Sequence, residues 1–509
     1  MEILSKVVEK AKLPVEIKTD SYLMDHAFLG QAVLPAVEAL ETLAVSTKAH
    51  LPQADVSLIT DARFDRFLLT APADRRRWIE IYNDVEVCGD GRIRSRLATR
   101  IRSPRVSITR VMEHVAVQFG GEGNNPVPLP LDVAFALQGI CMEISPHRLY
   151  RDLVPFGPTY HNAIAPLFLS KYGAVGNLKA GVSKDLPSGR LGSPFPLDAA
   201  FHLASAWVQR YGGFVGFPVG FDRRIIYSPT RPGENYVCRI KPVQRDAHAA
   251  PCFDIWIYDQ DGDLREEIAR LEMKDVSKGT FRPPPWILRG VETPELESLK
   301  TRCTGLSLIE LDTVHPLAEK ALSDDEAYRL HRMSPKRKIS YLAARLCCKS
   351  LYRGLSGDLI SPASSFTTVA PDGIRPQCPK IEDQGAVFCS VSHDSRFAVA
   401  VASNRPIGID VEEVSERVCR SRDIYMNKEE RDLVEGSALG EEAASVRIWS
   451  AKEAAAKAIG MSLAESWKKV SLKDIGRDRS ILKIGRRSHE AFHDAIDDHV
   501  FTAVNMETF

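Results

Sequence analysis

The sequence between residues 407 and 457 constrains the fold of this chain more than any other part of it. It contains IGIDVEE and, downstream, WSAKEAAAK. The alternation of apolar and polar residues in the first motif predicts a strand that projects Asp410 and Glu412 from one face. The second motif is rich in Ala, Lys and Glu and lacks Gly and Pro, which predicts a helix with Glu453 and Lys457 on one face. Three carboxylates beside a lysine suit Mg²⁺ bound to a pyrophosphate.

These two motifs resemble the signatures of the surfactin-synthetase type of 4′-phosphopantetheinyl transferase, (I/V)G(I/V)D.E and (F/W)(S/T/C).KE...K. The resemblance implies transfer of phosphopantetheine from coenzyme A to a serine of a carrier protein. It also implies that Asp410, Glu412 and Glu453 bind Mg²⁺. Glu453 would accept the proton of the serine, Lys457 would assist the departing 3′,5′-ADP, and Lys452 would clamp a phosphate. The alternative is a salt-bridged helix face exposed to solvent.

Basic and polar residues upstream extend the same resemblance. Arg345 and Lys349 lie four apart on one predicted helix face. The sequence GIRP resembles the GRP turn of the family with one extra residue, and VSHD matches its SH(S/D) turn. The resemblance implies that these segments hold the coenzyme A phosphates through Arg345, Lys349, Arg375, Ser392 and His393. For the helix residues, a basic face in solvent is the alternative.

The N-terminal part shows one predicted helix with several predicted strands, twice in succession. The first half contains His26, Gly30 and Pro35 in the pattern HxxxGxxxxP. The second half contains FGP around Gly157 and then DAAFH, which places Asp198 and His202 one helical turn apart. This organisation predicts two copies of a sheet wrapped around a helix.

The repeat and its motifs resemble the double-hotdog dehydratase domain of polyketide and polyunsaturated fatty-acid synthases. The resemblance implies that His26 and Asp198 act as base and acid in removing water from a 3-hydroxyacyl thioester, if burial keeps Asp198 protonated. Gly30, Pro35, Gly157 and His202 would position the substrate. Main-chain N–H groups near Leu29 and Gly30, at the expected start of the central helix, would polarise the thioester carbonyl. The alternatives are a catalytically silent module that docks an acylated carrier, and a non-enzymatic scaffold.

The expected fold class is α+β, with an N-terminal double hotdog and a C-terminal pseudo-twofold α/β transferase fold. The expected domains are residues 1–145 and 146–282 for the two hotdogs, 283–304 for a proline-rich linker, and 305–509 for the transferase. The pairing resembles the tail of enediyne-type iterative polyketide synthases.

Composition narrows the remaining function classes. The 509 residues carry a formal net charge of zero, which argues against nucleic acid and anionic membrane as partners. No apolar run reaches membrane-spanning length and no signal-peptide core is present, so a cytoplasmic location is expected. No carrier-type GxDSL serine occurs, so an acyl carrier protein, with polyketide or fatty-acid synthase components, is expected to act in trans. Coenzyme A is expected as substrate and Mg²⁺ as cofactor, and a homodimer is a weaker expectation because hotdog domains pair.

Overall fold

The computed structural model describes most of the chain and divides it into two compact units. The first unit contains residues 1–128 and 142–291, and the second contains residues 129–141 and 292–509. The described residues are 6–17, 21–70, 79–102, 109–120, 137–181, 189–243, 249–291, 295–358, 361–370, 376–377 and 387–506.

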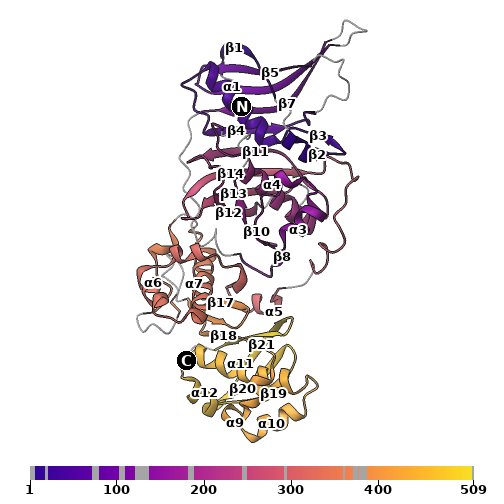
Figure 1. Ribbon diagram of the computed structural model, residues 1–509. Coiled ribbons are helices and arrows are strands. Elements are labelled where there is room, and N and C mark those ends of the chain that lie inside the picture. The colour runs from indigo at the N-terminus through magenta and orange to yellow at the C-terminus, as the bar shows by residue number, and fades with distance from the viewer. Residues whose placement is uncertain are drawn as a thin grey trace. The chain divides into compact units, whose positions relative to one another are not determined.

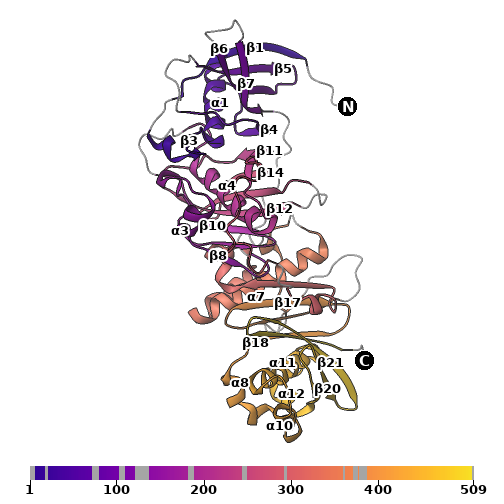
Figure 2. The same cartoon turned by 90° about the vertical axis from the view of Figure 1, so that its right-hand side faces the viewer.

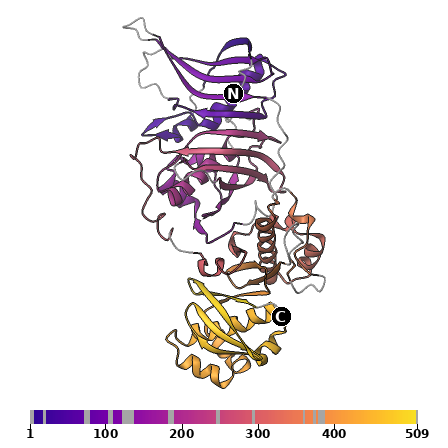
Figure 3. The same cartoon turned by 180° about the vertical axis from the view of Figure 1, so that it is seen from behind.

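One continuous antiparallel sheet dominates the first unit. Its strand order is β1-β5-β6-β7-β4-β11-β14-β13-β12-β10-β9-β8, so the strands of the two sequence halves meet where β4 pairs with β11. Seen from behind, these strands run side by side (Figure 3). The first-half strands are β1 (Val7–Pro14), β4 (Leu58–Phe64), β5 (Ile79–Cys88), β6 (Ile93–Arg102) and β7 (Thr109–Phe119). The second-half strands are β8 (Met142–Ile144), β9 (Leu167–Ser170), β10 (Gly173–Lys179), β11 (Phe217–Ile226), β12 (Asn235–Val243), β13 (Cys252–Asp259) and β14 (Leu264–Lys274).

Each half of this sheet packs against one central helix, α1 (Ala36–His50) in the first half and α4 (Phe195–Trp207) in the second (Figure 2). Twelve of the thirteen residues of α4 are buried, so this helix is a core element rather than an amphipathic surface helix. The predicted pattern of two sheet-wrapped helices is thereby confirmed, as is the α+β class.

Gly220 is required where the two halves join. It lies on β11 with a φ of +155°, and a Cβ there would approach the carbonyl oxygen of Ala62 on β4 to 2.3 Å. The glycine therefore allows the backbones of the two halves to pair closely.

The proline-rich segment differs from the expected extended spacer. Directly after the prolines at 283–285, Ile287 is fully buried in the core of the first unit. The guanidinium of Arg148 also stacks 3.7 Å from the Trp286 ring centroid. This part of the segment is therefore packed structure, and the boundary between the two units follows Val291.

The second unit contains two α/β halves. In the first, β15 (Gly305–Glu310), β17 (Phe397–Ser403) and β16 (Phe388–His393) form a sheet in that order, with α6 (Asp324–His331) and α7 (Pro335–Ser356) beside it. In the second, the strand order is β18-β22-β21-β20-β19, and α11 (Glu441–Ile459) lies against β18 and β22 (Figure 1). The bounds are β18 (Ile407–Glu413), β19 (Val470–Ile475), β20 (Arg479–Ile484), β21 (Arg487–Ile496), β22 (His499–Asn505), α10 (Lys428–Glu435) and α12 (Leu463–Lys469).

The two α/β halves of this unit meet at strands β16 and β18. The N–H of Ile409 on β18 donates to the Ser390 hydroxyl on β16 over 3.1 Å, and the two strands lie next to each other. Among the described residues, no helix is both long and apolar enough to cross a membrane.

Two candidate active sites

The predicted transferase motifs meet where β18 packs against α11. Gly408 makes this possible, because a Cβ at that position would lie 1.8 Å from the carbonyl oxygen of Ala454. Asp410 and Glu412 follow Gly408 at intervals of two residues and therefore project from the same face of the strand. Glu453, the residue before Ala454 on α11, faces the same region. The close strand–helix contact thus positions the acidic residues.

Asp410 forms the buried centre of this site. It is only 1% exposed, and its Oδ1 accepts hydrogen bonds from Lys457 Nζ at 2.8 Å and Ser392 Oγ at 2.9 Å. Lys457 Nζ also donates to Ser392 Oγ and to the Ile409 carbonyl, at 2.9 and 3.0 Å. Among the described residues, Oδ2 of Asp410 is buried without a hydrogen-bond partner. A buried carboxylate with one unused oxygen is suited to binding a further cation.

Glu412 and Glu453 add to the negative charge around Asp410. Burial and then the charge of Asp410 raise the pKa of Glu412 to about 7. The same two causes, in the same order, raise the pKa of Glu453, and Lys457 opposes them in part. Glu412 is held by Trp449 Nε1 at 3.2 Å and by Arg417 at 3.1 Å. Burial and the neighbouring carboxylates thus both disfavour the ionised forms of Glu412 and Glu453.

The donor set fits a hard divalent cation, since it consists of carboxylate oxygens around the unbonded Asp410 Oδ2. Within the described part of the chain, no three His, Cys, Asp or Glu side chains are already grouped closely enough to coordinate a metal ion. Glu412 bonded to Arg417, and Asp410 bonded to Lys457, account for this. Metal binding would therefore require these carboxylates to exchange partners.

Two predicted phosphate-binding residues lie near the acids. His393 is an exposed residue at the end of β16. Partial desolvation and then the charge of Lys457 lower its pKa, with Arg345 acting in the same direction. Arg345 donates to the Thr368 carbonyl oxygen at 2.8 Å, and its Nε has no hydrogen-bond partner in the part of the chain that the structure describes. Ser392, His393, Arg345 and Lys457 therefore lie within electrostatic reach of one another.

The structure corrects the predicted phosphate contacts of Lys349 and Lys452. Both side chains are fully buried and form ion pairs, Lys349 with Glu326 at 2.9 Å and Lys452 with Glu430 at 2.8 Å. Each ammonium also donates to main-chain carbonyls, so neither group faces a ligand. Arg375 lies outside the described residues.

His26 has the geometry of a general base in the first unit. Its Nδ1 lies 3.0 Å from the Val33 carbonyl oxygen, and because that oxygen can only accept, Nδ1 carries the proton. Nε2 then retains a free lone pair. Burial lowers the pKa of His26, which favours the neutral ring, while the charge of Asp198 offsets part of this effect. The ring stacks on Phe156 at a centroid distance of 4.2 Å.

Asp198 and His202 come from α4 in the other half of the sheet. Asp198 Oδ2 lies 3.1 Å from His202 Nε2, although the alignment of the two atoms does not make a hydrogen bond. Asp198 is 5% exposed and His202 is 4% exposed. They line a cavity of about 650 Å³ together with His26, Val33 and Leu34. The structure thus brings the predicted acid and base to one apolar cavity.

Gly30 has a different position from the one expected. The short strands β2 (Ala27–Phe28) and β3 (Gln31–Ala32) form a hairpin, and Leu29 and Gly30 make its turn with φ values of 51° and 75°. The central helix begins only at Ala36, after Pro35 at its N-cap. The predicted N–H groups of Leu29 and Gly30 are therefore not at a helix N-terminus, which corrects that expectation.

Gly157 lies where a loop of the second half approaches His26. A Cβ there would lie 2.3 Å from Asp25 Oδ1, and its N–H donates to the Asp25 carbonyl at 2.7 Å. Asp25 also accepts from the N–H and the hydroxyl of Thr159. Sequence reasoning missed Asp25; its place beside His26 was the available signal. The residue joins the two halves next to the candidate base.

The fold and the two sites define a hotdog-type acid–base cavity in one unit and a carboxylate-rich α/β site in the other. Residues 128–283 match the family model described as polyketide synthase dehydratase N-terminal domain, and residues 406–504 match that of the 4′-phosphopantetheinyl transferase superfamily. These two matches confirm the predicted resemblance of the N-terminal and C-terminal parts.

Individual relatives are similar to one part of the chain each. A holo-[acyl-carrier-protein] synthase of Anoxybacillus flavithermus is 29% identical over 106 residues, which cover 19% of this chain and 88% of that protein. An N-terminal dehydratase from the difficidin assembly line is 14% identical with a TM-score of 0.41, covering 54% of this chain and 94% of that one. The dehydratase domain of RzxB from Pseudomonas fluorescens is also 14% identical, with a TM-score of 0.40 and coverages of 52% and 94%.

Proposed function

We propose that the C-terminal unit transfers 4′-phosphopantetheine from coenzyme A to a serine of an acyl carrier protein supplied in trans. We further propose that the N-terminal unit dehydrates 3-hydroxyacyl thioesters on such a carrier, in polyketide or fatty-acid synthesis. The observation that carries the transferase proposal is the convergence of Asp410, Glu412, Glu453 and Lys457 at the β18–α11 contact.

In this proposal, the serine hydroxyl oxygen attacks the phosphorus of the phosphopantetheinyl group, and the pyrophosphate bond to 3′,5′-ADP breaks. Glu453 accepts the serine proton. Its raised pKa supports this role, because a general base is most effective when its pKa lies near the working pH. Lys457 and His393 hold the phosphate oxygens, and Lys457 stabilises charge on the leaving group. Mg²⁺, held by Asp410, Glu412 and Glu453, would supply positive charge that neutralises the pyrophosphate oxygens.

Intact-mass measurement of an apo-carrier after incubation with coenzyme A and Mg²⁺ tests the transferase. The wild type is expected to add one phosphopantetheine to the carrier, and Lys457→Ala to lower the rate about 100-fold or more. Lys468→Ala, at an exposed lysine on α12, is the control and should match the wild type. A carrier whose mass does not change with the wild-type protein would refute the proposal.

For the dehydratase, His26 Nε2 removes the proton from the α-carbon, and Asp198 donates a proton to the departing hydroxyl, so that one water leaves and the α,β double bond forms. The support is the one cavity that both residues line, together with the hydrogen bond of His26 Nδ1 to the Val33 carbonyl, which leaves Nε2 unprotonated. His202, close to Asp198, orients the carboxyl group.

Dehydration of a 3-hydroxyacyl carrier thioester by His26→Ala and Asp198→Asn tests this step. Each variant is expected to lose about 100- to 10,000-fold in kcat, whereas His147→Ala, at an exposed histidine, should not change it. Carrier binding without dehydration by the wild type would instead favour the alternative, a docking module for acylated carriers.

A further inference from the structure

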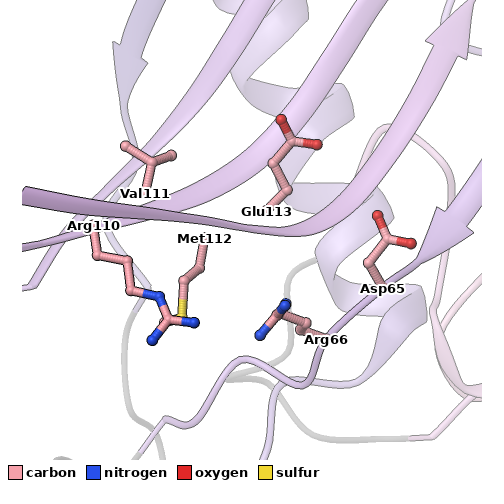
Figure 4. Close-up of a pocket in the computed structure, with 6 residues that line it drawn as sticks. All are labelled: Asp65, Arg66, Arg110, Val111, Met112 and Glu113. Atoms are coloured by element: carbon pink, nitrogen blue, oxygen red, sulfur yellow. The ribbon is translucent and has the colours of Figure 1, made fainter.

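A second pocket lies beside the dehydratase cavity in the first unit. It has a volume of about 480 Å³ and is formed by the start of β7 and the residues that follow β4. Figure 4 shows its lining: Asp65, Arg66, Arg110, Val111, Met112 and Glu113. The pocket is at the surface, since Arg66, Arg110 and Glu113 are exposed and Val111 is 51% exposed.

The pocket residues that belong to β7 point to two opposite sides of this strand. Arg110 and Met112 extend from one side of β7 toward the space that Arg66 also faces, whereas Val111 and Glu113 extend from the opposite side (Figure 4). Alternation along the strand explains this arrangement. The guanidinium groups of Arg66 and Arg110 thus share one region that the Glu113 carboxylate does not enter.

Both guanidinium groups are available to a ligand. Within the part of the chain that the structure describes, neither the Arg66 nor the Arg110 side chain has a hydrogen-bond or ion-pair partner. Asp65 and Glu113 also line this pocket, but in the described part of the chain neither carboxylate forms an ion pair with Arg66 or Arg110. Two unpaired guanidinium groups facing one space favour an anion with several oxygens, because each group offers five N–H donors.

The pocket adjoins the catalytic cavity. Asp65, Arg66 and Met112 line both, and the larger cavity reaches His26 and Asp198. A ligand that lies in the larger cavity with its reacting carbon at His26 can therefore reach Arg66 at the surface. On a carrier-bound thioester, the group at the surface end is the phosphate that joins the pantetheine arm to the carrier serine.

We propose that Arg66 and Arg110 form a subsite for the phosphate of a phosphopantetheine-linked acyl substrate. This inference rests on the proposed dehydratase function and adds the group by which the substrate is recognised. The arginines bind and orient the arm; they take no part in the acid–base chemistry.

The test compares two thioesters with the same 3-hydroxyacyl chain, one of 4′-phosphopantetheine and one of pantetheine, which lacks the phosphate. Arg66→Ala and Arg110→Ala should each lower kcat/KM for the phosphorylated thioester about three- to tenfold, through KM, and leave the pantetheine thioester unchanged. Arg63→Ala, at an exposed arginine on β4 that lines neither pocket, is the control and should affect neither substrate. Equal effects on both thioesters, or none on either, would overturn the proposal.

A binding measurement separates this inference from the proposed chemistry. Calorimetric titration with a saturated acyl-phosphopantetheine needs no turnover, and the transferase unit is identical in all the proteins compared. If the wild type dehydrates neither thioester, the catalytic proposal fails, and the phosphate subsite is still supported by weaker binding to Arg66→Ala/Arg110→Ala than to wild type. The difference should shrink as salt is raised. Equal binding by the two proteins would overturn the subsite.

Discussion

At the scale of single residues, Gly408 determines whether the carboxylate site can form. Alternation in the sequence predicted correctly that Asp410 and Glu412 share a face of a strand. It did not reveal that Gly408, two positions before Asp410, must lack a side chain, because that requirement comes from the carbonyl of Ala454 on a helix 46 positions later. Contacts between segments far apart in sequence leave no periodic signal.

Gly408→Ala is expected to destabilise the second unit by at least about 3 kcal/mol, because β18 must move away from α11 to accommodate the Cβ. Chemical denaturation followed by circular dichroism measures this. Gly354→Ala is the matched control: a Cβ on this glycine of α7 meets no atom within 4 Å, and alanine favours the helix by about 1 kcal/mol. Similar losses in both variants would contradict the close-contact explanation.

Of the two lysines in the WSAKEAAAK motif, Lys457 lies at the carboxylate site and Lys452 lies in the core. The motif alone could not assign them, because the Glu430 that pairs with Lys452 comes from another helix. Lys452→Met is expected to cost about 3–5 kcal/mol of stability, because Glu430 would remain buried without its cation. Lys457→Ala should cost less, because the Lys457 side chain is 29% exposed and the Ser392 hydroxyl still donates to Asp410. Thermal denaturation of the two variants would show the reverse order if Lys452 were the ligand-binding lysine.

At the scale of elements, the two α/β halves of the second unit contain the same kind of buried Glu–Lys ion pair. In each, a capping-box glutamate at the start of a short helix pairs with a lysine of the long helix that follows, Glu326 with Lys349 and Glu430 with Lys452. The other carboxylate oxygen of Glu326 accepts the main-chain N–H of Thr368, and that of Glu430 accepts the main-chain N–H of Leu472. The expected pseudo-twofold fold is supported by this repetition. The repetition was not predicted from the sequence.

Strand β22 fixes the turn that follows His393. Nδ1 of the buried His499 lies 2.6 Å from Asp394 Oδ2, while Asp394 Oδ1 accepts the N–H groups of Arg396 and Phe397. Desolvation opposes charge on both groups, but their mutual hydrogen bond and the other hydrogen bonds and charges around them together outweigh it, so the pKa of His499 is raised and that of Asp394 is lowered.

His499→Gln should therefore destabilise the protein by about 1–3 kcal/mol at mildly acidic pH. The contribution of a histidine with a raised pKa is complete below its unfolded value, near 6.5, and is lost as pH rises through the folded value. That of Asp394 is complete above its unfolded value, near 3.9, and is lost at lower pH. Unfolding free energies of wild type and variant should thus differ most near pH 5 and converge toward pH 8. A difference that grows with pH would contradict a charged pair.

At the scale of the whole molecule, the second unit is not one continuous segment of chain. Residues 137–141, from between the two hotdog halves, pair with its edge strand β15: Gln138 bridges Ile309, and the Gly139 N–H donates to the Leu308 carbonyl at 2.9 Å. The Ile140 N–H donates to Glu295 at 3.0 Å. The sequence there reads as a loop, and the pairing partner lies about 170 residues away, so sequence analysis assigned the segment to the first hotdog.

A fragment of residues 292–509 is expected to be less stable, by about 1–2 kcal/mol, than the same fragment preceded by residues 129–141 on a flexible linker. The cause is the loss of the main-chain hydrogen bonds at β15. Differential scanning calorimetry of the two fragments measures the effect, and a linker carrying the 13 residues in scrambled order is the control. Equal melting temperatures for all three would show that the segment contributes nothing.

The pairing of β4 with β11 has a consequence for how the dehydratase cavity behaves in dilute solution. Because a covalent chain carries both His26 and Asp198, and one uninterrupted sheet holds their two halves together, dilution cannot separate them. Any reaction that needs the two side chains at once will proceed at a rate per molecule that does not depend on how much protein is present.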